Sequence, residues 1–219
     1  MDFAGAFQWV NIRFLLDGLL LTLQVAVISV ILSIIFGVLL GVLRYWKIPI
    51  LSKVVGWIID IIRNLPLLLI IFFTYFALPQ MGIHLNIFWA AVAALSVFES
   101  AMISEIIRGG LESIPPGQAE AGLATGMTKM QIMRYILMPQ VFRDTLPSLV
   151  SQLIALIKDT SLATIITLPE LTHHAKIIYS LNTDYVVPMF VALAALYFIV
   201  CYTLSLFSKQ LAKRMATNT

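Results

Sequence analysis

The chain has few charged residues and almost no cysteine. Of its 219 residues, 11% are charged and 60% are hydrophobic, a balance far from that of soluble globular domains. The single cysteine, Cys201, excludes an intramolecular disulfide and a cysteine-based zinc site. The sequence also has no Walker A glycine loop, so any ATP must be hydrolysed by another chain. The composition indicates an integral membrane protein. We assign no catalytic residue in it.

Metal and nucleic-acid sites are not indicated either. His173 and His174 have no carboxylate or cysteine at metal-ligand spacing, so we expect them in a surface loop and predict no metal site. The net charge is +3, but no basic cluster is interleaved with aromatic residues. Nucleic acid is therefore not an expected partner. An intramembrane enzyme would need a cluster of reactive side chains, and we identify no such cluster in the sequence.

Five apolar runs are long enough to cross a bilayer core, which takes ~20 helical residues. They cover residues 18–43, 54–78, 87–107, 146–168 and 185–207. In the fourth run, two prolines predict a helix start near Asp144 or Thr145. Residues 169–184 are predicted to be a polar connection. The predicted fold is an all-α integral membrane domain with five transmembrane helices.

The basic residues lie mainly on one side of this arrangement. The first and third loops and the tail hold Arg44, Lys47, Lys53, Arg108, Lys129, Arg134, Arg143, Lys209, Lys213 and Arg214, whereas the opposite loops hold Arg13 and Lys176. Cytoplasmic loops accumulate Lys and Arg. We therefore predict that the N-terminus lies outside and the C-terminus lies in the cytoplasm.

Charged residues within the spans are candidates for a transport pathway. Arg63, Glu99 and Lys158 lie deep in their spans, where a charge costs at least ~2.5 to 3.5 kcal/mol. Asp159, with Thr160 and Ser161, follows Lys158 directly. Cations there would receive a carboxylate and anions an ammonium group, as a zwitterionic amino acid requires. The alternative is neutralisation within the chain, which the spacing of Arg63 from Asp60 permits.

A polar loop at residues 115–142 interrupts the apolar pattern. Pro115, Pro116 and Gly117 break the chain, and a short helix is predicted from Gln118 to Thr125 with Gly126 as its stop. Thr128 with Gln131 three residues later predicts a capping box and a second helix. Small side chains leave the first helix nearly free of bulk. This surface therefore suits close docking by another protein.

The same loop resembles a known motif. The residues that carry the resemblance are Glu120, Ala121, Gly122, Gly126, Ile136, Leu137, Met138 and Pro139. They are similar to the EAA loop of ATP-binding-cassette (ABC) importer permeases, with Gly122 where the family has a second alanine and Met138 where it has leucine. The similarity extends through SEIIRGGLESIPPGQ before the loop and IKDTSL after it. The chain thus resembles the polar amino acid subfamily, which has the type I permease fold.

This resemblance implies partners and a site. It implies a bacterial plasma-membrane complex with a second permease copy or paralogue, ATPase subunits that bind ATP and Mg, and an external substrate-binding protein, surrounded by membrane lipid. The residues implied to couple the permease to its ATPase are Gln118, Glu120, Ala121, Gly122, Gly126, Met127 and Pro139. The phrase FESAMISEIIRGG resembles members that handle acidic amino acids and their amides, so glutamine, glutamate or aspartate is the expected substrate.

An ion-coupled secondary amino acid transporter is the alternative from a different class. In such a protein, Glu99 or Asp159 would carry the coupling ion. Secondary transporters commonly contain internal repeats, and we find none in this chain. Transport by the purified chain without an ATPase would favour this alternative.

Overall fold

The structure is a computed structural model that describes residues 1–216, and its regular elements there are all helical. The helices are α1 (Phe3–Ala6), α2 (Trp9–Tyr45), α3 (Leu51–Asn64), α4 (Leu67–Phe72), α5 (Ile87–Ser113), α6 (Pro116–Ala124), α7 (Lys129–Ile132), α8 (Met138–Asp159), α9 (Leu171–Leu181) and α10 (Val186–Ala216). Short π or 3₁₀ segments are η1 (Phe73–Ala77), η2 (Leu78–Met81), η3 (Met133–Leu137), η4 (Thr160–Ile166) and η5 (Thr183–Tyr185). The prediction of an all-α fold is confirmed.

A few side chains lie outside this description. They are Ser208, Lys209, residues 211–216 and all of residues 217–219. The basic tail used for the topology prediction, Lys209, Lys213 and Arg214, therefore belongs to the part whose side chains are not described.

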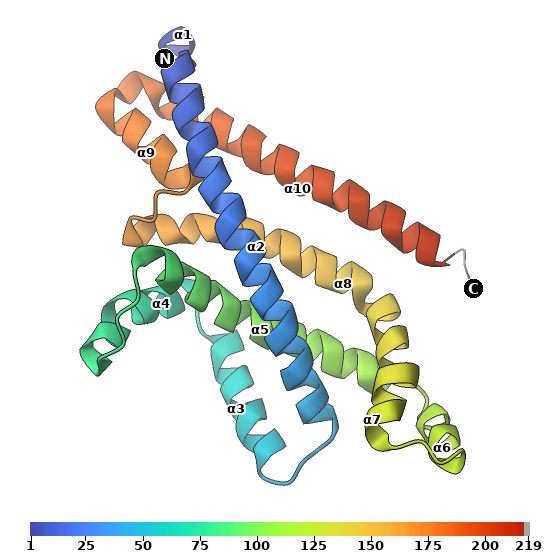
Figure 1. The fold of residues 1–219 in the computed structure, drawn as a ribbon. Helices are drawn as coiled ribbons and strands as arrows, with labels where there is room; N and C mark the ends of the chain where they lie inside the picture. The colour runs from blue at the N-terminus through green and yellow to red at the C-terminus, as the bar shows by residue number, and fades with distance from the viewer. Residues whose placement is uncertain (217–219) are drawn as a thin grey trace.

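The described residues include four helical segments long and apolar enough to span a membrane, or five if one bent pair counts as a span. The four segments are Trp9–Tyr45, Ile87–Ser113, Lys129–Ile166 and Thr183–Phe207, and the bent pair joins Leu51–Asn64 to Leu67–Met81 at 105°. Figure 1 shows α1 and α9 at one end of the molecule, and the start of α3 with α6 and α7 at the other. The loop at residues 115–142 thus lies at the same end as the first basic loop.

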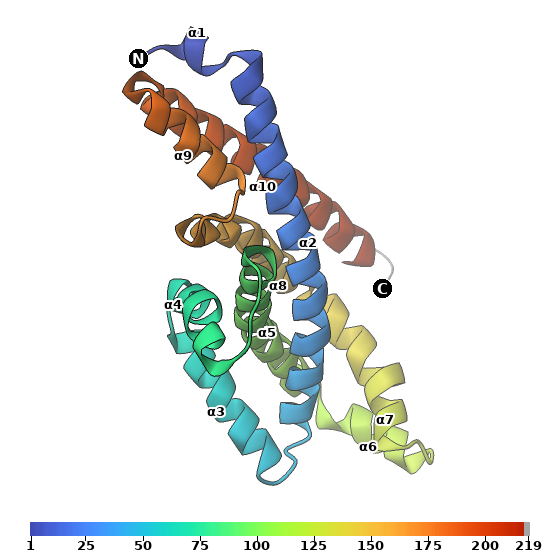
Figure 2. The same ribbon diagram turned by 60° about the vertical axis from the view of Figure 1, so that its left-hand side comes forward.

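Helix α2 packs against several other helices, most extensively against α5. It lies along α5 and also contacts α9, an arrangement visible from both directions in Figures 1 and 2. Its buried face carries small residues at helical spacing: Gly18, Thr22, Ala26, Ser29, Ser33, Gly37 and Gly41. A Cβ at Gly41 would lie 2.7 Å from the Ser104 carbonyl oxygen on α5. The small size of the residues along this seam allows the two helices to approach closely.

The second predicted span is bent sharply near its middle. Leu65 is extended, and Pro66 follows it as the N-cap of α4. Proline disfavours the helical conformation of the residue before it, so α3 ends at Asn64. The bend places the polar end of α3, with Arg63, next to α5 rather than in line with α4.

The predicted start of the helix that contains the fourth apolar run is wrong. Helix α8 does not begin near Asp144 or Thr145 but at Met138, with Pro139 in its first turn and Pro147 inside it. Pro147 removes one backbone hydrogen bond, yet Thr145 and Leu149 on either side are buried and hold the helix against its neighbours. Packing outweighs the local cost of the proline.

The prediction of a polar connection at residues 169–184 is also wrong, because this stretch contains α9. Its buried residues are Leu171, His174, Ala175 and Ile178. Their spacing of three, four and seven positions is that of one helix face. The signal was therefore in the sequence, hidden by polar residues on the other face. His174 belongs to the core and does not lie in a surface loop, and neighbouring His173 is half-buried on the same helix.

Candidate functional site

The loop at residues 115–142 forms two helices joined by a tight corner. Helix α6 begins at Pro116 and ends before Gly126, whose φ is +82°. This left-handed conformation is inexpensive for glycine and strained for other residues. The Thr128 hydroxyl accepts a hydrogen bond from the Gln131 amide at 3.3 Å, and the Gln131 side chain accepts one from the Thr128 amide at 2.8 Å. The predicted corner and capping box are confirmed.

One face of α6 is open and the other is anchored. Glu120, Ala121 and Leu123 are exposed, whereas Gly122 is buried against α7 and η3. A Cβ at Gly122 would lie 2.8 Å from the Ile132 side chain, so this glycine lets α6 approach the following helix closely. The Gln140 side chain also donates to the Gln118 side chain at 2.6 Å. The arrangement is a short, rigidly held helix with a free surface.

The other predicted loop residues have mixed environments. Met127 is half-buried and packs with the core cluster that includes Ile103 and Leu137. Gly126 and Pro139 are exposed. Met127 therefore fastens the corner to the membrane domain, while Gly126 and Pro139 remain accessible.

Glu99 is the most deeply buried of the charged residues in the predicted pathway. It lies on α5 and is 1% exposed. One of its oxygens accepts a hydrogen bond from the Gln152 side chain of α8 at 3.3 Å, and the other, Oε1, has no partner among the described residues. A buried carboxylate oxygen without a donor is costly. Glu99 is thus available for a group that the isolated chain does not supply.

Lys158, Asp159, Thr160 and Ser161 lie where α8 changes to the 3₁₀ segment η4. Lys158 is exposed, and no acid of the described residues lies within ion-pair distance of it. The Asp159 carboxylate lies within electrostatic range of Glu99. Thr160 is buried, and its hydroxyl donates back to the Ile157 carbonyl, as Ser161 does to Lys158. The structure therefore brings Glu99 and Asp159 into one region.

Arg63 belongs to a different cluster. Its guanidinium lies 3.5 Å from the Glu105 carboxylate and 4.0 Å from that of Asp60. Glu105 also pairs with Arg44 of α2 and with Arg108 of α5, the latter at 2.9 Å. Pairing of Glu105 with Arg108 follows from their spacing, but its convergence with Arg44 and Arg63 needs three helices to meet. Sequence reasoning had no signal for that convergence.

Glu170 is a buried acid that the sequence analysis missed. Its carboxylate is the N-cap of α9 and accepts hydrogen bonds from the amides of Thr172 and His173 at 2.9 and 2.8 Å. The Tyr197 hydroxyl donates to it at 3.2 Å. Burial raises the pKa of the Glu170 carboxyl to about 7. An acid directly after Pro169 and before an apolar helical period is the signal that would have identified this cap.

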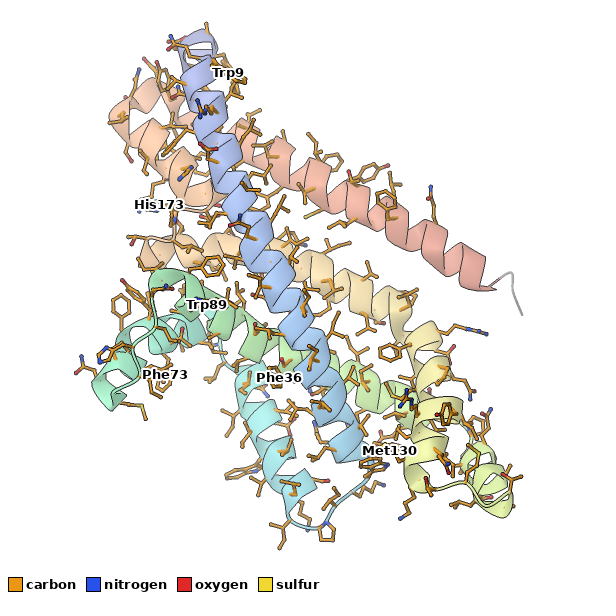
Figure 3. The ribbon with its side chains drawn as sticks, viewed as in Figure 1. Trp9, Phe36, Phe73, Trp89, Met130 and His173 are labelled. Atoms are coloured by element: carbon orange, nitrogen blue, oxygen red, sulfur yellow. The ribbon has the colours of Figure 1, made fainter. Side chains whose placement is uncertain are left out.

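The two histidines of α9 have separate roles in packing. His174 stacks on Phe14 of α2 with ring centroids 3.8 Å apart, and its Nδ1 lies 2.6 Å from the Phe14 carbonyl oxygen. His173, labelled in Figure 3, lies 3.5 Å from the Thr164 hydroxyl. In the part of the chain that the structure describes, no three His, Cys, Asp or Glu side chains gather as a metal site would require.

Comparison with known proteins identifies what this arrangement is similar to. Residues 9–217 match the family described as binding-protein-dependent transport system inner membrane component. A curated relative in Bacillus subtilis, the probable glutamine ABC transporter permease protein GlnP, is 53% identical over 98% of this chain and 99% of its own length. The arginine transport system permease protein ArtQ of the same organism is 33% identical over 100% of this chain and 99% of its own length.

Solved structures have the same fold. An amino acid ABC transporter crystallised with histidines matches with a TM-score of 0.87 and 30% identity, covering 98% of this chain and 99% of that one. The MetNI methionine ABC transporter in an inward-facing conformation matches with a TM-score of 0.82 and 22% identity, covering 95% and 99%. The type I ABC permease fold predicted from the loop is confirmed.

Proposed function

Because the chain belongs to the family of binding-protein-dependent transport system inner membrane components, we propose that the amino acid it moves is glutamine or a close chemical relative. The chain is a membrane-spanning permease subunit of an ABC importer for amino acids. This result favours the ABC importer over the ion-coupled secondary transporter. The proposal for glutamine is supported by the relative at 53% identity whose name includes that substrate.

The proposed pathway for the substrate runs past Glu99 and the end of α8. Glu99 has an oxygen without a donor, and Asp159 lies nearby. An ammonium group placed there would supply the missing donors through charge-assisted hydrogen bonds. Lys158, with no acid at ion-pair distance among the described residues, is proposed to receive the carboxylate. Thr160 and Ser161 position this turn through their backbone bonds.

Arg63 has a weaker claim to the substrate. Its guanidinium already faces Glu105 and Asp60, so a substrate carboxylate would have to compete with two acids of the chain itself. We retain Arg63 in the proposed pathway only for a state in which α3 has moved away from Glu105.

The proposed docking surface for the ATPase is the exposed face of α6. Glu120, Ala121 and Leu123 form its open side. The buried Gly122 lets the opposite side of the helix pack closely against α7 and η3. ATP and Mg would be bound by that partner, because this chain has no Walker A loop. A second permease copy or paralogue would complete the pathway, and an external binding protein would deliver the amino acid.

The proposed orientation places α6 and α7 in the cytoplasm and α1 outside, in a bacterial plasma membrane. The main support is the excess of basic residues at the α6 end. A single cysteine introduced at Gln131 of a cysteine-free chain should react with reagent only from the cytoplasmic side. A cysteine at Asn86 should react only from outside, and the reverse pattern would overturn the orientation.

The observation that carries the substrate proposal is the unsatisfied Glu99 carboxylate of this chain. It is considered together with the 53% identity to a probable glutamine permease. The test is ATP hydrolysis by the reconstituted complex with its binding protein, measured with glutamine, glutamate, aspartate and arginine. Glutamine should give the strongest stimulation. Stronger stimulation by arginine would overturn the proposed substrate while leaving the importer assignment intact.

Docking on α6 has its own test. Glu120→Lys and Gly126→Val should weaken retention of the ATPase and abolish uptake, while the permease remains inserted. Lys176→Glu, a charge reversal on exposed α9, serves as the control and should leave retention unchanged. Normal retention and uptake in both loop variants would refute the proposed surface.

A further inference from the structure

An apolar groove lies between the end of α2 and the segment formed by α7, η3 and the start of α8. It has a volume of about 660 Å³. Its walls include Val38, Leu39 and Val42 of α2, and Met133, Met138 and Phe142 on the opposite side. In Figure 3, Met130, another lining residue, lies beside the end of α2. The groove is separate from the region of Glu99 and from the exposed face of α6.

The walls of the groove are accessible from outside the chain. Leu39 and Met130 are 61% and 60% exposed, and Phe142 is 39% exposed. A contiguous apolar surface of this kind needs a covering partner or lipid. Because α2 spans the membrane, the groove from Val38 to Trp46 runs ~12 Å along the helix axis, from the hydrocarbon region toward the interface. This is the direction in which a lipid acyl chain lies.

The one charged residue among the described residues that line the groove is cationic. Arg134 of η3 lines it and is exposed, and no acid of the described residues lies within ion-pair distance of its guanidinium. The guanidinium lies 5.7 Å from the centroid of the Tyr135 ring. Trp46, at the C-terminal end of α2, also lines the groove. Tryptophan prefers the membrane interface, and arginine extends its charge to the headgroup level while its stem stays in apolar surroundings.

The lining residues contain no acid to balance this charge. Lys47 and Lys129 adjoin the lining residues Trp46 and Met130 in the sequence, so the chain around these residues is rich in one sign of charge. Basic pockets between transmembrane helices on the cytoplasmic side are typical sites for anionic lipid headgroups. An apolar wall with a cationic rim complements an acyl chain with an anionic phosphate.

We propose that this groove binds one anionic phospholipid of the cytoplasmic leaflet, with an acyl chain along α2 and its phosphate at Arg134. The proposal rests on the orientation given under the proposed function. A bound lipid fills the space between α2 and the α7–η3–α8 segment, and α6 packs directly on α7 and η3. Lipid occupancy therefore supports the position of α6, and transport by the complex depends on anionic lipid.

The test compares Arg134→Gln with Arg143→Gln in the reconstituted complex. Arg143 is an exposed basic residue of nearby α8 that does not line the groove. Substrate-stimulated ATP hydrolysis is titrated with phosphatidylglycerol in phosphatidylcholine vesicles. Arg134→Gln should require about fivefold more phosphatidylglycerol, since losing the contact between its guanidinium and the lipid phosphate should cost about 1 kcal/mol. Arg143→Gln should respond like the wild type, and Arg134→Lys should recover most of the response.

A direct binding measurement complements the titration. Photoactivatable phosphatidylglycerol should label the peptides that contain Met133 and Met138, and Leu39→Trp, which fills the groove without changing charge, should reduce the label. Equal lipid responses of the two arginine variants, or no label in these peptides, would overturn the lipid site. So would disulfide capture of a second permease or of the ATPase by a cysteine at Leu39, because a protein would then cover the groove.

These outcomes are distinct from failure of the proposed function. Glutamine-stimulated hydrolysis that is independent of phosphatidylglycerol removes the lipid site and leaves the importer and its substrate intact. External labelling of a cysteine at Gln131 removes the proposed orientation, and with it the cytoplasmic-leaflet site.

Discussion

Two carboxylates on α5, six positions apart, have opposite environments. Glu105 faces three arginines, Arg44, Arg63 and Arg108, which come from three helices. Glu99 is more deeply buried, yet its only hydrogen bond is to the neutral Gln152, and one of its oxygens has no partner among the described residues. Both carboxylate oxygens of Glu105 have cationic partners, whereas one oxygen of Glu99 has no hydrogen-bond partner among the described residues.

This difference separates an acid that joins helices from one that can receive a ligand. Replacing a satisfied carboxylate leaves several arginines without their partner, so the cost appears in stability. Replacing an unsatisfied buried carboxylate removes a group that was costly to bury, so the cost should appear in transport alone. The contrast also explains why depth in a span does not by itself identify a pathway residue.

The largest expected effect is on stability, from Glu105→Gln. Losing the charge should destabilise the chain by about 2 kcal/mol, less than for a fully buried pair because water reaches the arginines. Thermal unfolding of the purified protein measures this loss. Glu112→Gln, which removes only the exposed partner of Arg108, is the matched control and should change stability by at most about 0.5 kcal/mol.

An unfolding temperature of Glu105→Gln equal to that of the control would contradict a stabilising role for Glu105. The three arginines would then be satisfied by water, and the cluster would not join the helices.

A second effect should appear in transport, from Glu99→Gln. Uptake should fall about tenfold, because a charge-assisted hydrogen bond to the substrate contributes about 1.5 kcal/mol or more. Stability should be unchanged or higher, since a buried charge has been removed. Uptake and thermal unfolding are measured on the same preparation. Wild-type uptake, or a loss of stability as large as that of Glu105→Gln, would place Glu99 among the structural acids.

Lys158→Met tests whether the end of α8 receives the substrate, as proposed for Glu99, or only stabilises the fold, as proposed for Glu105. If Lys158 receives the substrate carboxylate, uptake should fall about fivefold, corresponding to about 1 kcal/mol for a charged contact at an exposed position. The double variant Lys158→Met with Asp159→Asn distinguishes the alternatives. Full recovery of substrate-stimulated ATP hydrolysis in the double variant would mean that the two residues only neutralise each other, and both would leave the proposed pathway.

The smallest expected effect is the pH dependence that Glu170 introduces. Its pKa is raised by burial from the usual 4.5 to about 7. A carboxyl whose pKa is higher in the folded state stabilises the fold when protonated, so this contribution is complete below about 4.5 and is lost as the pH rises through about 7. The unfolding temperature should therefore decline across that range, and Glu170→Gln should flatten the decline. An identical pH profile in the variant would contradict this role.

Local patterns predicted the elements whose formation depends on neighbouring residues. Gly126 and the Thr128–Gln131 pair mark the corner and the start of α7, since each acts on backbone groups within one turn of itself. Helix α6, in contrast, begins at Pro116 and not at the predicted Gln118. The same patterns failed at Pro147 and at residues 169–184, because buried side chains on either side of the proline, and one buried face of α9, outweighed local preference and composition.

Local sequence patterns were sufficient to predict the all-helical membrane fold and the helix–corner–helix loop, because hydrophobic length and backbone caps act over short stretches of chain. The partners of each charged residue, in contrast, depend on how the helices pack together. Arg63 and Glu105 are 42 positions apart, and Glu99 and Gln152 are 53 apart. The partners of a charge in a low-dielectric interior are set by which helices meet, and that depends on the small-residue seam of α2 and on the bend at Pro66.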